Sequence, residues 1–192
     1  MRGFYFSIGV HGNLYFGKGA SFFMRVFAEN ENVRIVFTER QDIPLVIDAE
    51  GEKENARYIC QWSFEQHMDA LDNPDILHLI VKNIDGKYIG YVIIKGMTNQ
   101  NNSIELMRIV ITNKGSGYGK SVISLIKKWC FEEQQAHRLW LDVQEDNVRA
   151  QHIYEGQGFK REGILRECIK VDQVYKSLVV MAILSQEHRA ED

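Results

Sequence analysis

The stretch NKGSGYGKSVI, residues 113–123, sets three glycines between an apolar run and a helical pattern. Glycines in such a turn let backbone N–H groups approach an anion closely, and a helix N-terminus adds about half a positive charge. An ATP-hydrolysing phosphate loop requires Gly, four arbitrary residues and then Gly-Lys-Ser/Thr. Gly119, Lys120 and Ser121 supply the end of that pattern, but Lys114 occupies its first position. The stretch therefore predicts a phosphate site and does not match an ATPase loop.

The strands expected before this loop also argue against an ATPase. Alternating and β-branched residues predict strands at 33–37, 77–83, 87–96 and 104–112. Asp85-Gly86 marks a tight hairpin turn between the second and third of them. An ATPase also needs a magnesium-binding Asp at the end of a parallel strand, and the nearest candidate, Asp142, has unsuitable surroundings. The sequence therefore argues against an ATP-dependent function.

Helical and strand patterns alternate through the remainder of the chain. Apolar residues at three- and four-residue spacing predict a helix directly after the loop, running to about Cys130. Further helices are expected at 42–50, 54–71 and 147–157, and further strands at 137–143, 159–165 and 174–184. The sequence thus predicts one α/β domain with a mostly antiparallel sheet.

Length, charge and cysteine content exclude several classes of protein. The 192 residues suit one well-buried core, and no apolar run approaches the ~20 residues of a membrane helix. A net charge of -3 and a pI near 6.1 argue against a nucleic-acid partner. Cys60, Cys130 and Cys168 lack a metal-ligand spacing, which predicts reduced, mostly buried thiols in a cytoplasmic protein without a metal.

The chain divides into three segments. Residues 1–32 are rich in Phe, Tyr and Gly, and polar residues interrupt every apolar core that a signal peptide could use. We expect them to form an extension that packs on the domain or on a neighbouring chain, as in a homodimer. Residues 33–184 are the expected folded domain, and residues 185–192 the expected C-terminal tail.

Two signatures in the second half of the chain resemble a known family. KGSGYG, residues 114–119, resembles the Arg/Gln-x-x-Gly-x-Gly/Ala signature of the GNAT superfamily of N-acetyltransferases, with Lys at its first position. LDVQEDNVRAQHIYEGQGF, residues 141–159, resembles the next signature, in which a strand precedes Asn-x-x-Ala, Tyr and Gly-Phe. The following KREGILRE is similar to the branch containing ribosomal-protein N-terminal acetyltransferases and related small-amine acetyltransferases. The resemblance covers about residues 33–184.

This resemblance implies a fold and a reaction. The GNAT fold has a mixed, mostly antiparallel sheet of about seven strands, splayed in the middle and flanked by helices on both faces. Acetyl-CoA inserts its pantetheine arm at the splay and gives its acetyl group to a primary amine. The amine belongs to a small molecule or a peptide N-terminus, and it attacks directly in a ternary complex. The alternative is a non-catalytic acyl-CoA-binding sensor or regulatory protein.

The resemblance also assigns the cofactor contacts. The implied residues are Ile109, Val110, Ile111, Lys114, Gly115, Ser116, Gly117, Tyr118, Gly119, Lys120, Ser121, Asn147, Ala150 and Tyr154. The strand residues among them are also candidates for the core, and Asn147 is also a candidate helix N-cap.

Two residues are the expected catalytic groups. Tyr154, at the matched position after Asn-x-x-Ala, is expected to donate a proton to the departing CoA sulfur, although a tyrosine on an amphipathic helix is ordinarily a core residue. A carboxylate must take the proton of the substrate ammonium, and Glu105 matches a position where the family often places one. An exposed strand-end charge is an equal interpretation of Glu105. Asp142, Glu145 and Asp146 are weaker candidates for the base.

Overall fold

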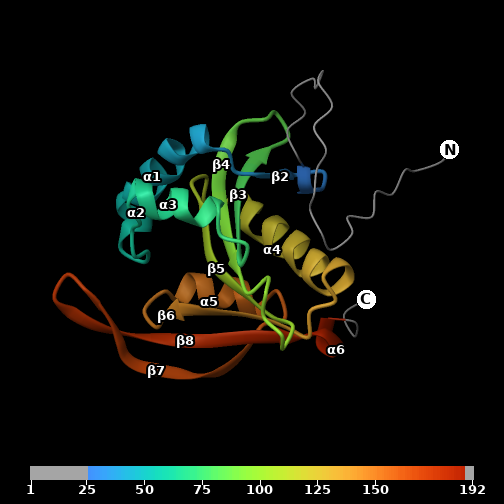
Figure 1. Ribbon diagram of the computed structural model, residues 1–192. Coiled ribbons are helices and arrows are strands. Elements are labelled where there is room, and N and C mark those ends of the chain that lie inside the picture. Colours follow the sequence, from blue (N-terminus) through green and yellow to red (C-terminus); the bar gives the residue numbers. More distant parts are fainter. Residues whose placement is uncertain (1–25, 189–192) are drawn as a thin grey trace, which may run out of the picture.

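One twisted sheet of eight strands organises residues 26–188, which are the residues that this computed structural model describes (Figure 1). Their spatial order is β1-β2-β3-β4-β5-β6-β8-β7. The strands are β1 (Val26–Glu29), β2 (Val33–Phe37), β3 (Ile76–Asn83), β4 (Tyr88–Lys95), β5 (Ser103–Ile111), β6 (Arg138–Gln144), β7 (Lys160–Val171) and β8 (Val174–Leu184). The expected mixed, mostly antiparallel sheet is confirmed, because β5 and β6 are the one parallel pair among the described strands.

The helices are interspersed with these strands. They are η1 (Arg40–Asp42), α1 (Ile43–Gly51), α2 (Lys53–Ala56), α3 (Phe64–Leu71), α4 (Tyr118–Lys128), the π-helical turn η2 (Trp129–Glu133), α5 (Val148–Glu155) and α6 (Ser185–His188). None of the helices within residues 26–188 is long and apolar enough to span a membrane.

The eighth strand, β1, falls within the residues expected to form the N-terminal extension. It pairs with β2 in antiparallel register, from Val26 opposite Val36 to Glu29 opposite Arg34. The expected domain start at Val33 therefore lies inside a hairpin of the sheet. The packing expected for the rest of the extension concerns residues 1–25, which lie outside the described residues.

The sheet splays between its two parallel strands. β5 and β6 pair only over Ser103–Glu105 and Arg138–Trp140, at the start of each strand. Beyond this point, β5 continues to bond β4 and β6 continues to bond β8. The edges of β5 and β6 that face each other are therefore open over their second halves, which confirms the expected splay.

A bulge in β5 coincides with the start of the splay. Ile93 of β4 lies opposite Arg108, whereas Lys95 lies opposite Glu105, so three steps along β5 match two along β4. Such a bulge interrupts the ladder and re-aims the side chains beside it. Here it lies directly after the last residue of β5 that pairs with β6.

Helices cover both faces of the sheet, as expected (Figure 1). One face carries α4 and α5, whose apolar residues join the larger core cluster with Leu106 and Leu141. The other face carries α1, whose Val46 and Ala49 pack with Tyr91, Ile93 and Val110 in a smaller cluster. We call this second side the α1 face.

The prediction of one helix over residues 54–71 is wrong in the middle of that range. The structure has α2 at its start and α3 at its end, with residues 57–63 in neither helix. Ser63 caps α3 through a capping box, because its hydroxyl accepts from the Gln66 backbone amide and its own backbone amide donates to Gln66 Oε1. The segment before it is held by tertiary contacts to Glu50 and Arg108, which overrides its helical pattern.

The last two strands form a hairpin that extends past the rest of the sheet (Figure 1). β7 continues to Val171, well beyond the strand expected at 159–165, and pairs with β8 to the end. Asp172 and Gln173 both adopt positive φ, as a two-residue hairpin turn that follows the strand twist requires. Apolar side chains are exposed on this hairpin, including Ile164, Leu165 and Tyr175.

Candidate active site

The glycine loop leaves its backbone open on one side. Gly115 and Gly117 have φ of 89° and 79°, conformations that other residues adopt with strain, and Gly117 is the N-cap of α4. A Cβ added to Gly115, Gly117 or Gly119 would meet nothing within 4 Å. The loop therefore turns tightly without packing against the protein itself, so a ligand can reach its amides.

The first turn of α4 supplies donors to such a ligand. The amides of Lys120 and Ser121 donate back to the Gly117 carbonyl at 3.1 and 3.2 Å. The amides of Tyr118 and Gly119 have no acceptor within the helix, as is general for a helix start. Lys114, one of the implied cofactor contacts, forms an ion pair with Glu54 of α2 at 3.0 Å.

These features fit the diphosphate and pantetheine of coenzyme A. Open amides at a helix N-terminus suit an anion. The unpaired edge of β5 runs through Ile109, Val110 and Ile111, where an extended amide chain can add as a strand. Asn147 caps α5 by accepting from the Ala150 amide at 3.2 Å, so its interpretation as an N-cap is confirmed. The cofactor contacts assigned to the loop, strand and helix residues stay predictions.

Tyr154 projects from α5 into the larger core cluster and is 8% exposed. Burial, with a smaller contribution from the charge of Asp142, raises the pKa of its phenol. The hydroxyl therefore keeps its proton at neutral pH. Asp142, whose charge contributes to this shift, belongs to the half of β6 that no longer pairs with β5.

Glu105 and Asp142 lie together on the α1 face of the sheet. Glu105 pairs with Trp140 at the last rung before the splay, and Asp142 follows two residues later on the same side of β6. Burial first, and then the negative charge of Asp142, raise the pKa of Glu105, while Lys95 opposes the shift. Asp142 has an exposed side chain, but the protein atoms around its carboxylate partly desolvate it and raise its pKa as well. Two carboxylates thus border the splay on the face opposite Tyr154.

A hollow of about 360 Å³ extends this carboxylate site. Its lining is Asp75, Lys95, Gly96, Thr98, Asn99, Ser103, Glu105 and Trp140. Asp75 accepts bonds from the Thr98 amide and hydroxyl at 2.9 and 2.6 Å, which help to hold its pKa low despite partial burial. Asp75 was not predicted from the sequence, because no local pattern places the residue before β3 beside Glu105.

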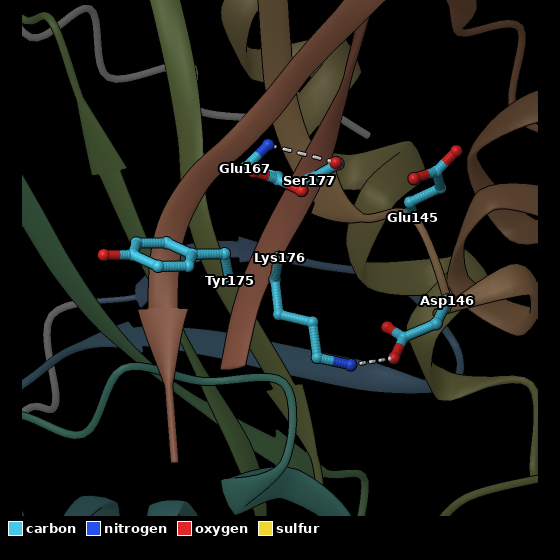
Figure 2. Close-up of a pocket in the computed structure, with 6 residues that line it drawn as sticks. All are labelled: Glu145, Asp146, Glu167, Tyr175, Lys176 and Ser177. Carbon is cyan, nitrogen blue, oxygen red and sulfur yellow. Dashed lines mark hydrogen bonds and ion pairs between the residues drawn. The ribbon is translucent and has the colours of Figure 1, made fainter. Parts of the chain in front are cut away.

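A second hollow, of about 370 Å³, lies at the other end of β6 (Figure 2). In Figure 2, Lys176 of β8 points toward Asp146, with Lys176 Nζ 2.6 Å from Asp146 Oδ2, while the Tyr175 ring points away from both acidic residues. Glu145 is five residues beyond Trp140, which corresponds to roughly 16 Å of strand. Glu145 and Asp146 are therefore remote from Glu105.

The three cysteines differ in exposure, and Cys130 is not placed as an acyl-carrying nucleophile. Cys130 is fully buried in the larger core, and burial raises the pKa of its thiol. Cys60 and Cys168 are exposed, so the expectation of mostly buried thiols is wrong. Within residues 26–188 no three His, Cys, Asp or Glu side chains gather as a metal site.

Comparison with known proteins assigns the chain to a family. The model of the acetyltransferase (GNAT) family matches residues 37–159, which include the loop, the splayed strands and α5. This chain is a member of the GNAT family. As a GNAT protein it is an acetyl-CoA-dependent N-acetyltransferase that acts on a primary amine, and acetyl-CoA is its cosubstrate. This confirms the transferase interpretation over the non-catalytic one.

Named relatives of this GNAT enzyme include polyamine acetyltransferases. The spermidine N(1)-acetyltransferase of Vibrio cholerae is 25% identical over 146 residues, covering 70% of this chain and 84% of that protein. Its counterpart in Escherichia coli K12 is 24% identical over 168 residues, covering 83% and 90%. The crystal structure of the Vibrio cholerae enzyme with CoA and spermine has a TM-score of 0.75 at 22% identity, covering 83% and 99%. These relatives act on spermidine, so the ribosomal-protein branch stays a prediction.

Proposed function

We propose that this enzyme acetylates a primary amine of a polyamine or a similar small polycation. The observation that carries this proposal is the set of carboxylates on the α1 face beside the splay, Asp75, Glu105 and Asp142. Several carboxylates near one another attract a chain of ammonium groups and disfavour an anionic acceptor. The names of the spermidine acetyltransferase relatives support the same substrate class.

The proposed reaction uses one residue on each face of the sheet. Glu105 takes a proton from the ammonium, so that the neutral nitrogen can attack the acetyl carbonyl carbon. The C–N bond forms first and gives a tetrahedral intermediate, which collapses as the C–S bond breaks and Tyr154 gives its proton to the departing sulfur. The second proton of the nitrogen is lost to solvent, and solvent returns a proton to Tyr154. Backbone amides of β5 near Val110 stabilise the negative charge that develops on the carbonyl oxygen. No covalent acetyl-enzyme is formed.

An acceptor screen tests the substrate class. With acetyl-CoA present, we expect spermidine and spermine to release free CoA with higher kcat/KM than a monoamine of similar length, because the additional ammonium groups contact carboxylates. A short peptide with a free N-terminus represents the alternative acceptor. Turnover confined to the peptide would reject the polyamine proposal and favour the ribosomal-protein branch. Acetyl-CoA binding without any turnover would instead favour the non-catalytic alternative.

The pH dependence tests Glu105 as the base. A base must be deprotonated, so kcat/KM for the amine falls as the pH drops through the pKa of Glu105. Because burial raises that pKa, this acidic limb of the pH profile should lie above the ordinary value of 4.5. Glu105→Gln should lower kcat by about 10²- to 10⁴-fold. Asp142→Asn is the matched variant: it removes a charge that raises the Glu105 pKa, so the limb should move to lower pH. An unmoved limb in Asp142→Asn, or full activity in Glu105→Gln, would assign the base elsewhere.

The assembly of this enzyme stays a prediction. One similar solved structure, at 22% identity and a TM-score of 0.73, is a dodecamer of the Vibrio cholerae spermidine N-acetyltransferase. That likeness supports the fold alone. The exposed apolar residues of the β7–β8 hairpin are compatible with the homodimer expected from the sequence.

A further inference from the structure

A buried polar network lies on the α1 face and has no part in the reaction proposed above. At its centre is the Glu50 carboxylate at the end of α1, which is 1% exposed. Glu50 Oε1 accepts from Arg108 Nη1 at 2.5 Å and from the Tyr91 hydroxyl, and Oε2 accepts from the Trp62 amide at 2.9 Å. His67 Nε2 lies 3.5 Å from Oε1. The carboxylate thus has donors on both oxygens, as a buried charge requires.

The network continues away from Glu50 through two histidines. His67 Nδ1 lies 3.0 Å from His78 Nε2, and His78 Nδ1 lies 2.9 Å from the Thr38 hydroxyl. Burial, with the charges of His67 and Arg108, lowers the pKa of His78 to about 3, so its ring is neutral. Burial opposes ionisation of Glu50, but its four partners lower its pKa to about 2. Glu50 and Arg108 therefore form a buried ion pair within the network.

Arg108 connects this network to the splay. It is the first residue of β5 to pair with β4 after the bulge, three positions from Glu105 on the strand that borders the cofactor gap. Its Nη2 donates to the Cys60 carbonyl at 2.8 Å, and its guanidinium lies 4.6 Å from the centre of the Trp62 ring. The Arg108 side chain thus connects β5, the end of α1 and the 57–63 segment on the α1 face.

We propose that Glu50 and Arg108 are positioning residues, which hold the 57–63 segment against β5 as one wall of the acceptor site. Two hydrogen bonds hold this segment in place. Glu50 accepts from the Trp62 amide, and Arg108 donates to the carbonyl of Cys60, two residues earlier on the same segment. The same two contacts hold the segment outside a helical conformation. The inference rests on the proposed amine acetylation, since it concerns the acceptor and not acetyl-CoA.

Arg108→Lys is the sharpest variant. Lysine keeps a cation for Glu50, but its single ammonium cannot reproduce the fork that spans Glu50 and Cys60. We expect faster hydrogen exchange in a peptide covering 57–63, and kcat/KM for the amine lower by on the order of ten- to a hundredfold. The Kd of acetyl-CoA should stay unchanged. Arg34→Met is the control, because it removes a 2.7 Å pair between Arg34 of β2 and Glu29 of β1, remote from the splay.

Glu50→Gln combined with Arg108→Met separates positioning from stability. Removing both charges avoids an unpaired buried ion, so the double variant should melt nearer to the wild type than Arg108→Met does. A purely structural pair would then recover the amine KM together with the melting temperature. We expect the amine KM and the exchange of 57–63 to remain altered.

Several results would overturn the inference. Unchanged exchange of 57–63 in folded Arg108→Lys shows that the pair does not hold the segment. Equal losses of amine and acetyl-CoA affinity place its effect on the whole fold, and a recovered amine KM in the double variant does the same. If the wild type acetylates no amine, the proposed function fails by itself, while the exchange measurement still decides whether the pair holds the segment.

Discussion

Tyr154→Phe should lower kcat by about 10²- to 10⁴-fold, which is the usual effect of losing a general acid. The thiolate of CoA then departs without a proton from the phenol. The Kd of acetyl-CoA should not change, because the ring that packs with Phe159 in the larger core is retained. Stopped-flow or steady-state release of free thiol gives kcat, and calorimetry gives the Kd.

Tyr88→Phe is the matched control for this variant. The Tyr88 hydroxyl is also buried, and no hydrogen-bond partner of it is found among the described residues. Its removal should leave kcat unchanged. A Tyr154→Phe enzyme that loses cofactor affinity and kcat to the same extent would indicate that Tyr154 shapes the site and does not act as the acid.

Gly117→Glu should abolish acetyl-CoA binding. Saturation of the wild type at about 100 times Kd stabilises it by about 2.7 kcal/mol. For a chain of this size that corresponds to a rise of about 5–10 °C in Tm. In the variant, the carboxylate stands where the diphosphate is expected, and glutamate is strained at the φ of 79° that Gly117 adopts. A thermal melt with and without acetyl-CoA measures both effects.

Gly86→Glu separates strain from charge at the loop. Gly86 has the same φ of 79° and the same open surroundings, but it lies in the turn between β3 and β4. Both variants should therefore lose Tm in the absence of ligand, while only Gly117→Glu should lose the rise caused by acetyl-CoA. A rise of equal size in Gly117→Glu and the wild type would show that the diphosphate binds elsewhere.

The glycine loop and the strands around it could be predicted because their signals are local. A hairpin turn at Gly86 and apolar alternation in β3 to β6 depend on residues close in sequence, and these strands lie within one or two residues of the expected bounds. Asn147 as an N-cap needed only its own helix. The pairing of Glu105 with Trp140 was beyond such signals, because register between distant strands depends on the packed sheet.

The 57–63 segment shows why a local pattern can fail. Its apolar spacing continues that of the helices on either side, but the amide of Trp62 and the carbonyl of Cys60 bond to Glu50 and Arg108. A buried carboxylate and guanidinium must find partners, and the free energy of leaving them unpaired exceeds the few tenths of a kcal/mol per residue that helix propensity offers. Contacts between residues 48 positions apart are invisible in a local pattern.

The sequence alone was sufficient to recognise the family. The glycine loop, and the Asn-x-x-Ala helix start with Tyr154, are each made of residues that are close together in the sequence. The acceptor side required the folded molecule. Asp75, Glu105 and Asp142 come from three separate segments, and the Glu50–Arg108 pair joins a helix to a strand. The degree of burial of these carboxylates, and the charged groups near each of them, are set only when the sheet forms. Both depend on which side chains the strand register brings together.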